Sequence, residues 1–347
     1  MVDGVGRDAG ARPEPGELAF GLPVRKPRHR TDPAWQSVRV NTPHIAIIFN
    51  PSKIERQELC DAFDRVDPDA CAAASWFETT EDDPGRGMAR EALAHGAEVV
   101  VVAGGDGTVR AVAEVLAGED AVLGIIPQGT GNLLARNLEV PIGDTAAAIE
   151  RALGTGERRI DIGWVDTGDG EERGFAVMVG FGLDAHMLVE TDDDLKDKAG
   201  WLAYVAALGK AIAASDVVEF TLAIDDDDPQ TLSGHTFIVG NCGTVQGGVA
   251  LLPDAVLDDG RLDALVVSAD GLIGWLDTVR SFVWDNGIRR FFANDDEAAD
   301  AETATHLGGA RMTVELPKPL PFEIDGEEAG EVRTFTVRVH AGALRVR

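Results

Sequence analysis

The stretch Glu98-Val-Val-Val-Val-Ala-Gly-Gly-Asp-Gly-Thr108 decides the fold of the first half of this chain. Its consecutive valines are typical of a strand that is buried on both faces of a sheet. The glycines that follow let the main chain approach a ligand closely, and a helix starting there offers unpaired N–H groups and partial positive charge. The stretch therefore predicts a phosphate-binding loop at a strand end. It is neither a Walker A loop nor a GxGxxG dinucleotide loop, because the residues that define those motifs are missing.

Similar apolar runs at His44–Phe49 and Val122–Ile126 predict two more buried strands. Helical patterns lie between and after these strands, at roughly 55–66, 86–95, 108–117 and 144–153. Alternation of strands and helices predicts right-handed crossovers and a parallel sheet. We therefore expect an α/β domain over residues 42–158, with the last strands, about 333–347, as candidates to join it.

After residue 158 the pattern changes to short strands separated by turn clusters such as Asp225-Asp-Asp-Asp-Pro229. This pattern predicts an antiparallel β-sandwich domain over residues 159–332. Two helical segments, 196–214 and 271–291, carry apolar stripes that indicate either core packing or a groove or membrane-surface element. The strands are expected at Ile160–Val165, Phe175–Val179, Val217–Ile224, Thr236–Gly240 and Leu262–Val267, and from Arg311 to the end.

The chain has a formal net charge of −29, which repels phosphate backbones and makes nucleic acid an unexpected partner. No apolar run approaches the ~18–20 residues of a membrane span, and no signal-peptide core follows Met1. The three cysteines show no CxxC spacing, so we expect a cytoplasmic protein. Residues 1–41 form a proline-rich, basic segment that we interpret as a flexible arm, either a tether to acidic lipids or a solvated tail.

Two more loops are expected to meet the glycine loop. Pro127-Gln-Gly-Thr-Gly-Asn132 follows the third predicted strand and Asn50-Pro-Ser-Lys53 follows the first. Because the carboxyl ends of parallel strands share one edge of a sheet, the three loops should line one crevice. Asp106 is too acidic to touch phosphate directly, so it should act through Mg²⁺ or position the reacting hydroxyl.

Three further motifs occur later in the chain, at residues 161–163, 257–263 and 325–327. With the loops above, the chain resembles the diacylglycerol kinase catalytic-domain family, and most closely its soluble bacterial lipid kinases. The five residues from Gly104 to Thr108 are shared with NAD kinases and by themselves name only a superfamily. The motifs that carry the resemblance are Gly104-Gly-Asp-Gly-Thr108, Pro127-Gln-Gly-Thr-Gly-Asn132, Asp161-Ile-Gly163, Leu257-Asp-Asp-Gly-Arg-Leu-Asp263 and Asp325-Gly-Glu327.

The resemblance implies a site for ATP and Mg²⁺ in the first domain, with the acceptor lipid between the domains. It makes Glu327 the proton acceptor from the lipid hydroxyl, and it assigns Asp106 and Asp161 to a metal and water network. It also implies a structural Mg²⁺ held by Asp259 with main-chain groups of Val256 and Arg261. The residues implied in nucleotide binding are Asn50, Pro51, Ser52, Thr80, Gly104, Gly105, Gly107, Thr108, Gly129, Thr130 and Asn132.

The chain departs from the family pattern in several places. Lys53 and Ile54 stand where the family usually has a glycine after the serine of the Asn-Pro loop, and Arg110 stands where an asparagine is common. Glu327 is followed by a second glutamate, Glu328, although the register of the motif favours Glu327 as the base. The lone His186 is expected to pack or to form a hydrogen bond rather than to act in catalysis.

The predicted function is therefore an ATP- and Mg²⁺-dependent lipid kinase acting on diacylglycerol or a related lipid such as a sphingoid base or ceramide. The substrate would be presented by a membrane surface, with which the protein associates peripherally and transiently. Two alternatives stay open: a kinase for a soluble acceptor such as NAD, and an inactive regulator that binds nucleotide or lipid. A homodimer through paired edge strands also stays open.

Overall fold

The computed structural model describes residues 43–182, 216–245, 251–267 and 304–347. The expectations for the basic arm (1–41), the helical segments 196–214 and 271–291, and His186 concern residues outside these ranges. Within the described ranges, no helix is long and apolar enough to cross a membrane.

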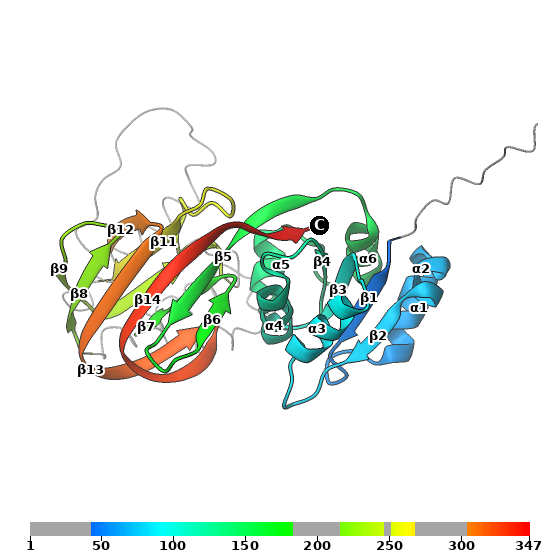
Figure 1. Cartoon of the computed structure of the whole chain (residues 1–347), viewed down its shortest axis with the longest axis horizontal. Helices are drawn as coiled ribbons and strands as arrows, with labels where there is room; N and C mark the ends of the chain where they lie inside the picture. Colours follow the sequence, from blue (N-terminus) through cyan, green and yellow to red (C-terminus); the bar gives the residue numbers. More distant parts are fainter. Residues whose placement is uncertain (1–42, 183–215, 246–250, 268–303) are drawn as a thin grey trace, which may run out of the picture. The chain divides into compact units, whose positions relative to one another are not determined.

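A parallel sheet with strand order β2-β1-β3-β4 forms the first domain (Figure 1). Every residue of β1 and β3 is buried, as their unbroken apolar runs predict. Helix α1 packs against α6, and α3 packs against α4. The bounds are β1 Ile45–Phe49, α1 Arg56–Val66, α2 Pro68–Ala73, β2 Ser75–Glu78, α3 Arg86–Ala94, β3 Val99–Gly104, α4 Asp106–Leu116, β4 Val122–Pro127, α5 Leu133–Asn137 and α6 Thr145–Leu153.

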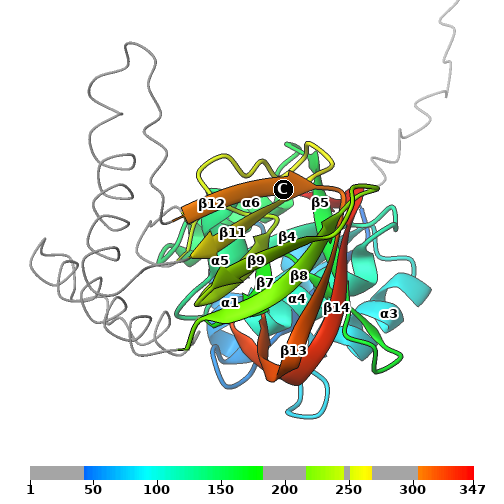
Figure 2. The ribbon, with the colours of Figure 1, turned by 90° about the vertical axis from the view of Figure 1, so that its left-hand side faces the viewer.

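An antiparallel sandwich forms the second domain, which Figure 2 shows face on. Strands β12-β11-β10-β7-β13-β14 follow one another in the sheet, with β9-β8 paired to β13 and β6-β5 paired to β14. The largest side chains of its core are phenylalanines, for example Phe237, Phe322 and Phe335. The bounds are β5 Arg158–Asp166, β6 Glu172–Phe175, β7 Met178–Phe181, β8 Val218–Ile224, β9 Gln230–Gly234, β10 Thr236–Gly240, β11 Leu262–Val267, β12 Ala304–Gly309, β13 Arg311–Ile324 and β14 Glu327–Val346. The predicted fold class, α/β plus an antiparallel sandwich, is confirmed.

Strands β5 and β14 belong to both domains. The end of β14 pairs in parallel with β4, Arg345 opposite Val122, and it also pairs with the start of β5. Val346 lies in the core of the α/β domain, whereas Val337 of the same strand lies in the core of the sandwich. The end of β14 therefore extends the parallel sheet, and the predicted domain bounds at residues 158 and 332 stay predictions.

The single strand expected over Phe175–Val179 is wrong. The chain forms β6 and β7 instead, and the residues between them leave the ladder. The main-chain N–H groups of Ala176, Val177 and Met178 each donate to the Asp325 carboxylate at 2.9 Å. The Asp325 carboxylate, more than a hundred residues away in the sequence, thus accepts hydrogen bonds that the carbonyl groups of a neighbouring strand would otherwise accept. Strands β2 and β9, which are short and partly exposed, were not predicted.

Candidate functional site

The three predicted loops lie at one edge of the parallel sheet and are joined by main-chain hydrogen bonds. The N–H of Asn50 donates to the carbonyl of Ala103 at 2.9 Å, and the N–H of Gln128 donates to the carbonyl of Gly104 at 2.9 Å. Successive strand ends are therefore locked side by side. The three loops therefore converge at one edge of the sheet, and the crevice that they were expected to line stays a prediction.

Two glycines allow the second and third strand-end loops to touch. A Cβ atom added to Gly129 would lie 2.7 Å from the Cα of Gly105, closer than real Cβ contacts come. The main chain that follows β3 therefore packs directly against the main chain that follows β4. Helix α4 begins at once, and the N–H groups of its first turn have no acceptor within the helix. These N–H groups and the positive end of the helix dipole suit a phosphate group.

Asp106 holds the loop that follows β4. Its carboxylate accepts hydrogen bonds from the N–H groups of Asn132 at 2.8 Å and Leu133 at 2.6 Å, where α5 begins. Burial raises the pKa of Asp106, and these hydrogen bonds from Leu133 and Asn132 act in the opposite direction. The carboxylate is thus engaged by protein donors on one side. Each oxygen still has lone-pair capacity for a cation.

Asn132 shapes its own loop. It adopts a left-handed conformation with φ of 48°, and its side-chain oxygen accepts from the N–H of Gly129 at 2.9 Å. Its amide nitrogen donates to the carbonyl of Gly129 at 2.5 Å. The contacts of Asn132 are therefore internal, and Thr130 at the tip of the loop is exposed. The predicted roles of Gly129, Thr130 and Asn132 in nucleotide binding stay predictions.

The loops after β1 and β2 expose hydroxyl groups. Asn50 accepts two hydrogen bonds from Ser52, from its N–H at 3.0 Å and its hydroxyl at 2.8 Å. Thr80 accepts from the N–H of Asp83 at 3.1 Å. Pro51 and Lys53, like Ser52 and Thr80, are exposed. Both loops are closed by their own hydrogen bonds and present polar groups outward, and their predicted contacts with ATP stay predictions.

A hairpin carries Glu327 to the glycine loop. Asp325 and Gly326 both have positive φ, 50° and 82°, which is the two-residue turn that Asp-Gly favours between antiparallel strands. A Cβ added to Gly107 would collide with an oxygen of the Glu327 carboxylate. The Glu327 carboxylate therefore occupies the space beside Gly107, and a side chain at position 107 would have to displace it. Residues separated by most of the chain meet at the first turn of α4.

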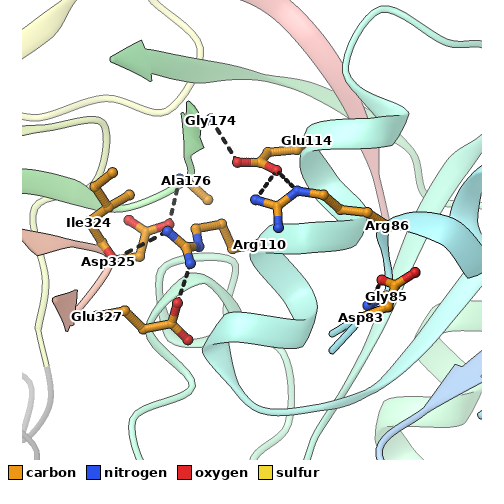
Figure 3. A network of polar contacts seen from close by, with 10 residues as sticks. All are labelled: Asp83, Gly85, Arg86, Arg110, Glu114, Gly174, Ala176, Ile324, Asp325 and Glu327. Atoms are coloured by element: carbon orange, nitrogen blue, oxygen red, sulfur yellow. Dashed lines mark hydrogen bonds and ion pairs between the residues drawn. The ribbon is translucent and has the colours of Figure 1, made fainter. Parts of the chain in front are cut away.

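Arg110 contacts the same hairpin (Figure 3). Its guanidinium forms an ion pair with Glu327 and a long hydrogen bond, 3.5 Å, to the carbonyl of Ile324. Burial raises the pKa of Asp325 to about 6, and the nearby charge of Arg110 opposes that rise. The buried Nε of Arg110 has no hydrogen-bond partner among the described residues.

A second ion pair lies along α4. Arg86 of α3 pairs with Glu114, whose other oxygen accepts from the N–H of Gly174 at 2.8 Å. Asp83 accepts from the N–H groups of Gly85 and Gly87, at 2.9 and 2.8 Å, and so holds the start of α3. Figure 3 shows the contacts of Glu114 with Arg86 and Gly174 beside the Arg110 pair. Sequence reasoning missed them because a lone charge on a helix face gives no sign of a distant partner.

Asp161 ties the last strand to the Asp-Asp-Gly turn. It is buried, and its carboxylate accepts from the N–H groups of Gly260 at 2.7 Å and Gly342 at 2.6 Å. Among the described residues, no hydrogen bond or ion pair connects Asp161 with Asp106. These contacts suit a positioning role, and membership of a catalytic metal and water network stays a prediction.

The turn predicted to hold structural Mg²⁺ is acidic. Asp259 accepts from the N–H of Arg261 at 2.9 Å, and Val256 is exposed. The pKa of Asp263 is raised by burial and then by the charges of Asp259 and Asp254. A cation at the turn would offset these negative charges, and the structural Mg²⁺ there stays a prediction. In the described ranges no group of three or more His, Cys, Asp or Glu side chains could hold a metal by itself.

A pocket of about 730 Å³ lies between helices α3 and α4 and strands β5 and β6. Its wall is strongly charged, so it does not suit acyl chains. The pocket is therefore not a candidate for the lipid tails. Its lining residues are Arg86, Arg90, Leu93, Glu114, Val115, Glu119, Trp164, Glu171, Glu172 and Arg173.

Comparison with known proteins places the chain among lipid kinases. The family model of the diacylglycerol kinase catalytic domain matches residues 44–165, and that of the YegS C-terminal NAD kinase beta sandwich-like domain matches residues 177–347. A protein of Stenotrophomonas maltophilia, named as a YegS-like lipid kinase, is 30% identical over 322 residues, which cover 88% of this chain and 96% of that protein. The chain belongs to the diacylglycerol kinase catalytic-domain family.

Two other members of the diacylglycerol kinase family extend this result. A diacylglycerol kinase of Mycobacterium tuberculosis is 30% identical over 185 residues, 53% of this chain and 60% of that protein. The crystal structure of a diacylglycerol kinase from Bacillus anthracis has the same fold, with a TM-score of 0.62 at 19% identity over 87% of this chain and 96% of that one. The predicted family and the enzyme class, a phosphotransferase with an alcohol group as acceptor, are confirmed.

Proposed function

We propose that the chain is an ATP- and Mg²⁺-dependent lipid kinase that transfers the γ-phosphoryl group to a hydroxyl of diacylglycerol or a related lipid such as a sphingoid base or ceramide. One observation carries the proposal. The Glu327 carboxylate lies against Gly107, at the first turn of α4. A proton acceptor and a phosphate cradle are therefore in contact, which is what transfer to a hydroxyl requires.

The protein's part in this reaction is positioning. Phosphate oxygens would accept hydrogen bonds from the N–H groups at the start of α4, and the hydroxyl of the lipid would donate to Glu327. As the hydroxyl oxygen forms its bond to phosphorus, the bond to the leaving oxygen of ADP breaks and the proton passes to the carboxylate. The exposure of Glu327, whose side chain is 54% accessible, leaves room for an acceptor to approach.

Two groups of residues suit Mg²⁺. Asp106 offers one carboxylate beside the cradle, and Mg²⁺ at kinase sites is held by one or two carboxylates together with substrate phosphates. The ion supplies charge that offsets the triphosphate. Asp259 would hold a structural ion at the turn, where its charge and that of Asp254 add to the effect of burial in raising the pKa of Asp263.

The lipid would come from a membrane surface to which the protein binds peripherally. The net charge of −29 opposes binding to anionic lipid, so attraction needs a local element. The basic segment within residues 1–41 offers one. A homodimer through edge strands is compatible with this arrangement and is tested by the mass of the protein in solution.

Transfer of labelled phosphate from ATP decides the function. The acceptor panel contains diacylglycerol, sphingosine and ceramide in mixed micelles, and NAD in solution. Label in one of the lipids, lowered by about 10²–10⁴-fold in Glu327→Gln, is the expected result. Label in NAD alone would replace the proposal with a kinase of a soluble acceptor. ATP binding without transfer to any acceptor would indicate a regulator instead.

A further inference from the structure

We propose that Arg110 is a positioning residue of this site, which holds the β13–β14 hairpin so that the Glu327 carboxylate stays at Gly107. The inference rests on the proposed function, because Arg110 acts through the proton acceptor assigned there.

Arg110 lies on α4, so it links the glycine loop at the start of this helix directly to the β13–β14 hairpin. Arg110 comes four residues after Asp106, and residues at this spacing share one face of a helix. The helix that begins with the glycine loop therefore also carries the cation that binds the hairpin. A displacement of the hairpin relative to the loop would have to break this ion pair.

The two partners of the pair differ in burial. The Arg110 side chain is only 13% exposed, whereas that of Glu327 is 54% exposed. A buried guanidinium is restricted by its surroundings, and its charge is screened less by water than that of a surface arginine. Arg110 therefore serves as the fixed partner, and Glu327 is the partner whose position is set.

The guanidinium acts on three parts of the hairpin. It donates to the carbonyl of Ile324, lowers the pKa of Asp325 against the effect of burial, and pairs with Glu327. Asp325 in turn holds the segment 176–178 through three main-chain hydrogen bonds. The turn is thus fastened to α4 on one side and to the sandwich on the other. The planar, many-donor geometry of arginine suits this task better than a lysine.

A double-mutant cycle tests the inference. In the lipid assay we expect Arg110→Met to lower kcat by about 10- to 100-fold, which does not exceed the ~10²–10⁴-fold that a general base contributes. The KM for ATP should stay within about twofold, because the polar contacts of Arg110 within the described ranges go to Ile324 and Glu327 and not to the loops proposed to bind nucleotide. In a Glu327→Gln background the same substitution should change kcat by less than about twofold, since the group that Arg110 positions is already gone.

Arg110→Lys keeps the positive charge but loses the planar guanidinium with its several N–H donors. The kcat of this variant should therefore lie between those of the wild type and Arg110→Met. Arg338→Met is the matched control, because Arg338 lies on the same strand as Glu327 and forms an exposed pair with Glu172, and its kcat should not change. Equal losses from Arg110→Met in the wild-type and Glu327→Gln backgrounds would make the role purely structural and overturn the inference.

Hydrogen exchange gives a readout that does not depend on turnover. In Arg110→Met, and less in Arg110→Lys, amides of 324–328 and 176–178 should exchange faster, whereas Arg338→Met should leave them unchanged. If wild-type protein phosphorylates no acceptor, the proposed function fails, and the exchange rates still decide whether Arg110 holds the hairpin. Unchanged exchange in both Arg110 variants would refute the inference.

Discussion

Asp106 joins two loops of the site through one carboxylate. The residue starts α4, yet its oxygens accept from the first N–H groups of α5, 26 and 27 residues further along the chain. The glycines around it allow this approach, since a Cβ on Gly131 would lie 2.7 Å from the Asp106 carboxylate. A side chain of another shape or charge would disturb both loops at once.

Asp106→Asn should abolish turnover while the fold stays intact. The amide can accept only one of the two hydrogen bonds, because its nitrogen would face an N–H donor, and the charge for Mg²⁺ is lost. We expect kcat to fall by at least about 100-fold, a loss typical of removing one group that stabilises transition-state charge. Labelled transfer measures the loss, and circular dichroism verifies the fold.

Asp228→Asn, at an exposed turn between β8 and β9, is the control and should keep wild-type activity. Full activity in the Asp106 variant would remove Asp106 from the nucleotide site.

At the scale of elements, the β13–β14 hairpin connects the glycine loop with the sandwich. Its turn residue Asp325 is buried and accepts from three main-chain N–H groups of 176–178. This contact explains why β6 and β7 are separate strands. It also fixes the register in which Glu327 leaves the turn, because Ile324 and Glu327 form the closing pair of the hairpin.

Asp325→Ala should destabilise the protein in a pH-dependent way. Three buried N–H donors lose their acceptor, each at a cost of about 1–3 kcal/mol. In the wild type, burial raises the pKa of Asp325 from 3.8 to about 6, so the folded chain binds this proton more tightly than the unfolded chain. The stability that Asp325 contributes therefore increases as pH falls from about 6 toward 3.8.

Urea unfolding at several pH values measures the effect. The difference between wild type and Asp325→Ala should widen below about pH 6, by up to about 1.4 kcal/mol per pH unit. Arg110 and the Cys242 thiol are the ionisable groups that interact with Asp325. Asp225→Ala is the control, because this exposed carboxylate accepts from the N–H groups of Ala310 and Arg311. A pH-independent difference for Asp325 would contradict the prediction.

The Asp258-Asp-Gly260 turn gives a second prediction at this scale. If Mg²⁺ binds at Asp259, it should raise the melting temperature of nucleotide-free protein. A ligand at about 100 times its Kd stabilises by about 2.7 kcal/mol. Asp259→Asn should lose most of this rise, whereas Asp228→Asn should keep it. Equal rises in both variants would exclude the turn as the Mg²⁺ site.

At the scale of the whole molecule, charge is the main constraint on function. A net charge of −29 repels an anionic membrane, yet a lipid kinase must reach its substrate there. Basic residues are concentrated in Val24-Arg-Lys-Pro-Arg-His-Arg30. The sequence therefore combines a basic segment, which anionic lipid attracts, with an acidic remainder, which anionic lipid repels. Salt screens both interactions, so it weakens the contribution of the basic segment to membrane binding and weakens the repulsion of the remainder.

Deletion of residues 1–40 should weaken binding to anionic vesicles mainly at low salt. The Debye length falls from ~30 Å at 0.01 M to ~3 Å at 1 M salt, so the contribution of the basic segment should vanish at high salt. Sedimentation with anionic and neutral vesicles measures this. Equal binding of both proteins at low salt would show that another element attaches the enzyme.

Local patterns were enough to predict the α/β domain and its loops. The apolar runs of β1, β3 and β4 identify buried strands, and strand–helix alternation predicts the parallel sheet. The convergence of the loops at Asn50, Gly105 and Gly129 then follows from strand direction alone. These features were predictable because each depends on residues that are close in the sequence.

Long-range contacts were decided only by the tertiary structure. Arg110 and Glu327 are 217 residues apart, and neither residue's neighbours indicate that they pair. The break between β6 and β7 depends on Asp325, 147 to 149 residues away. The valine strand and its glycine loop thus indicate a phosphate site from sequence alone. Which carboxylate faces that site, and which cation holds it there, depends on how the last hairpin packs against α4.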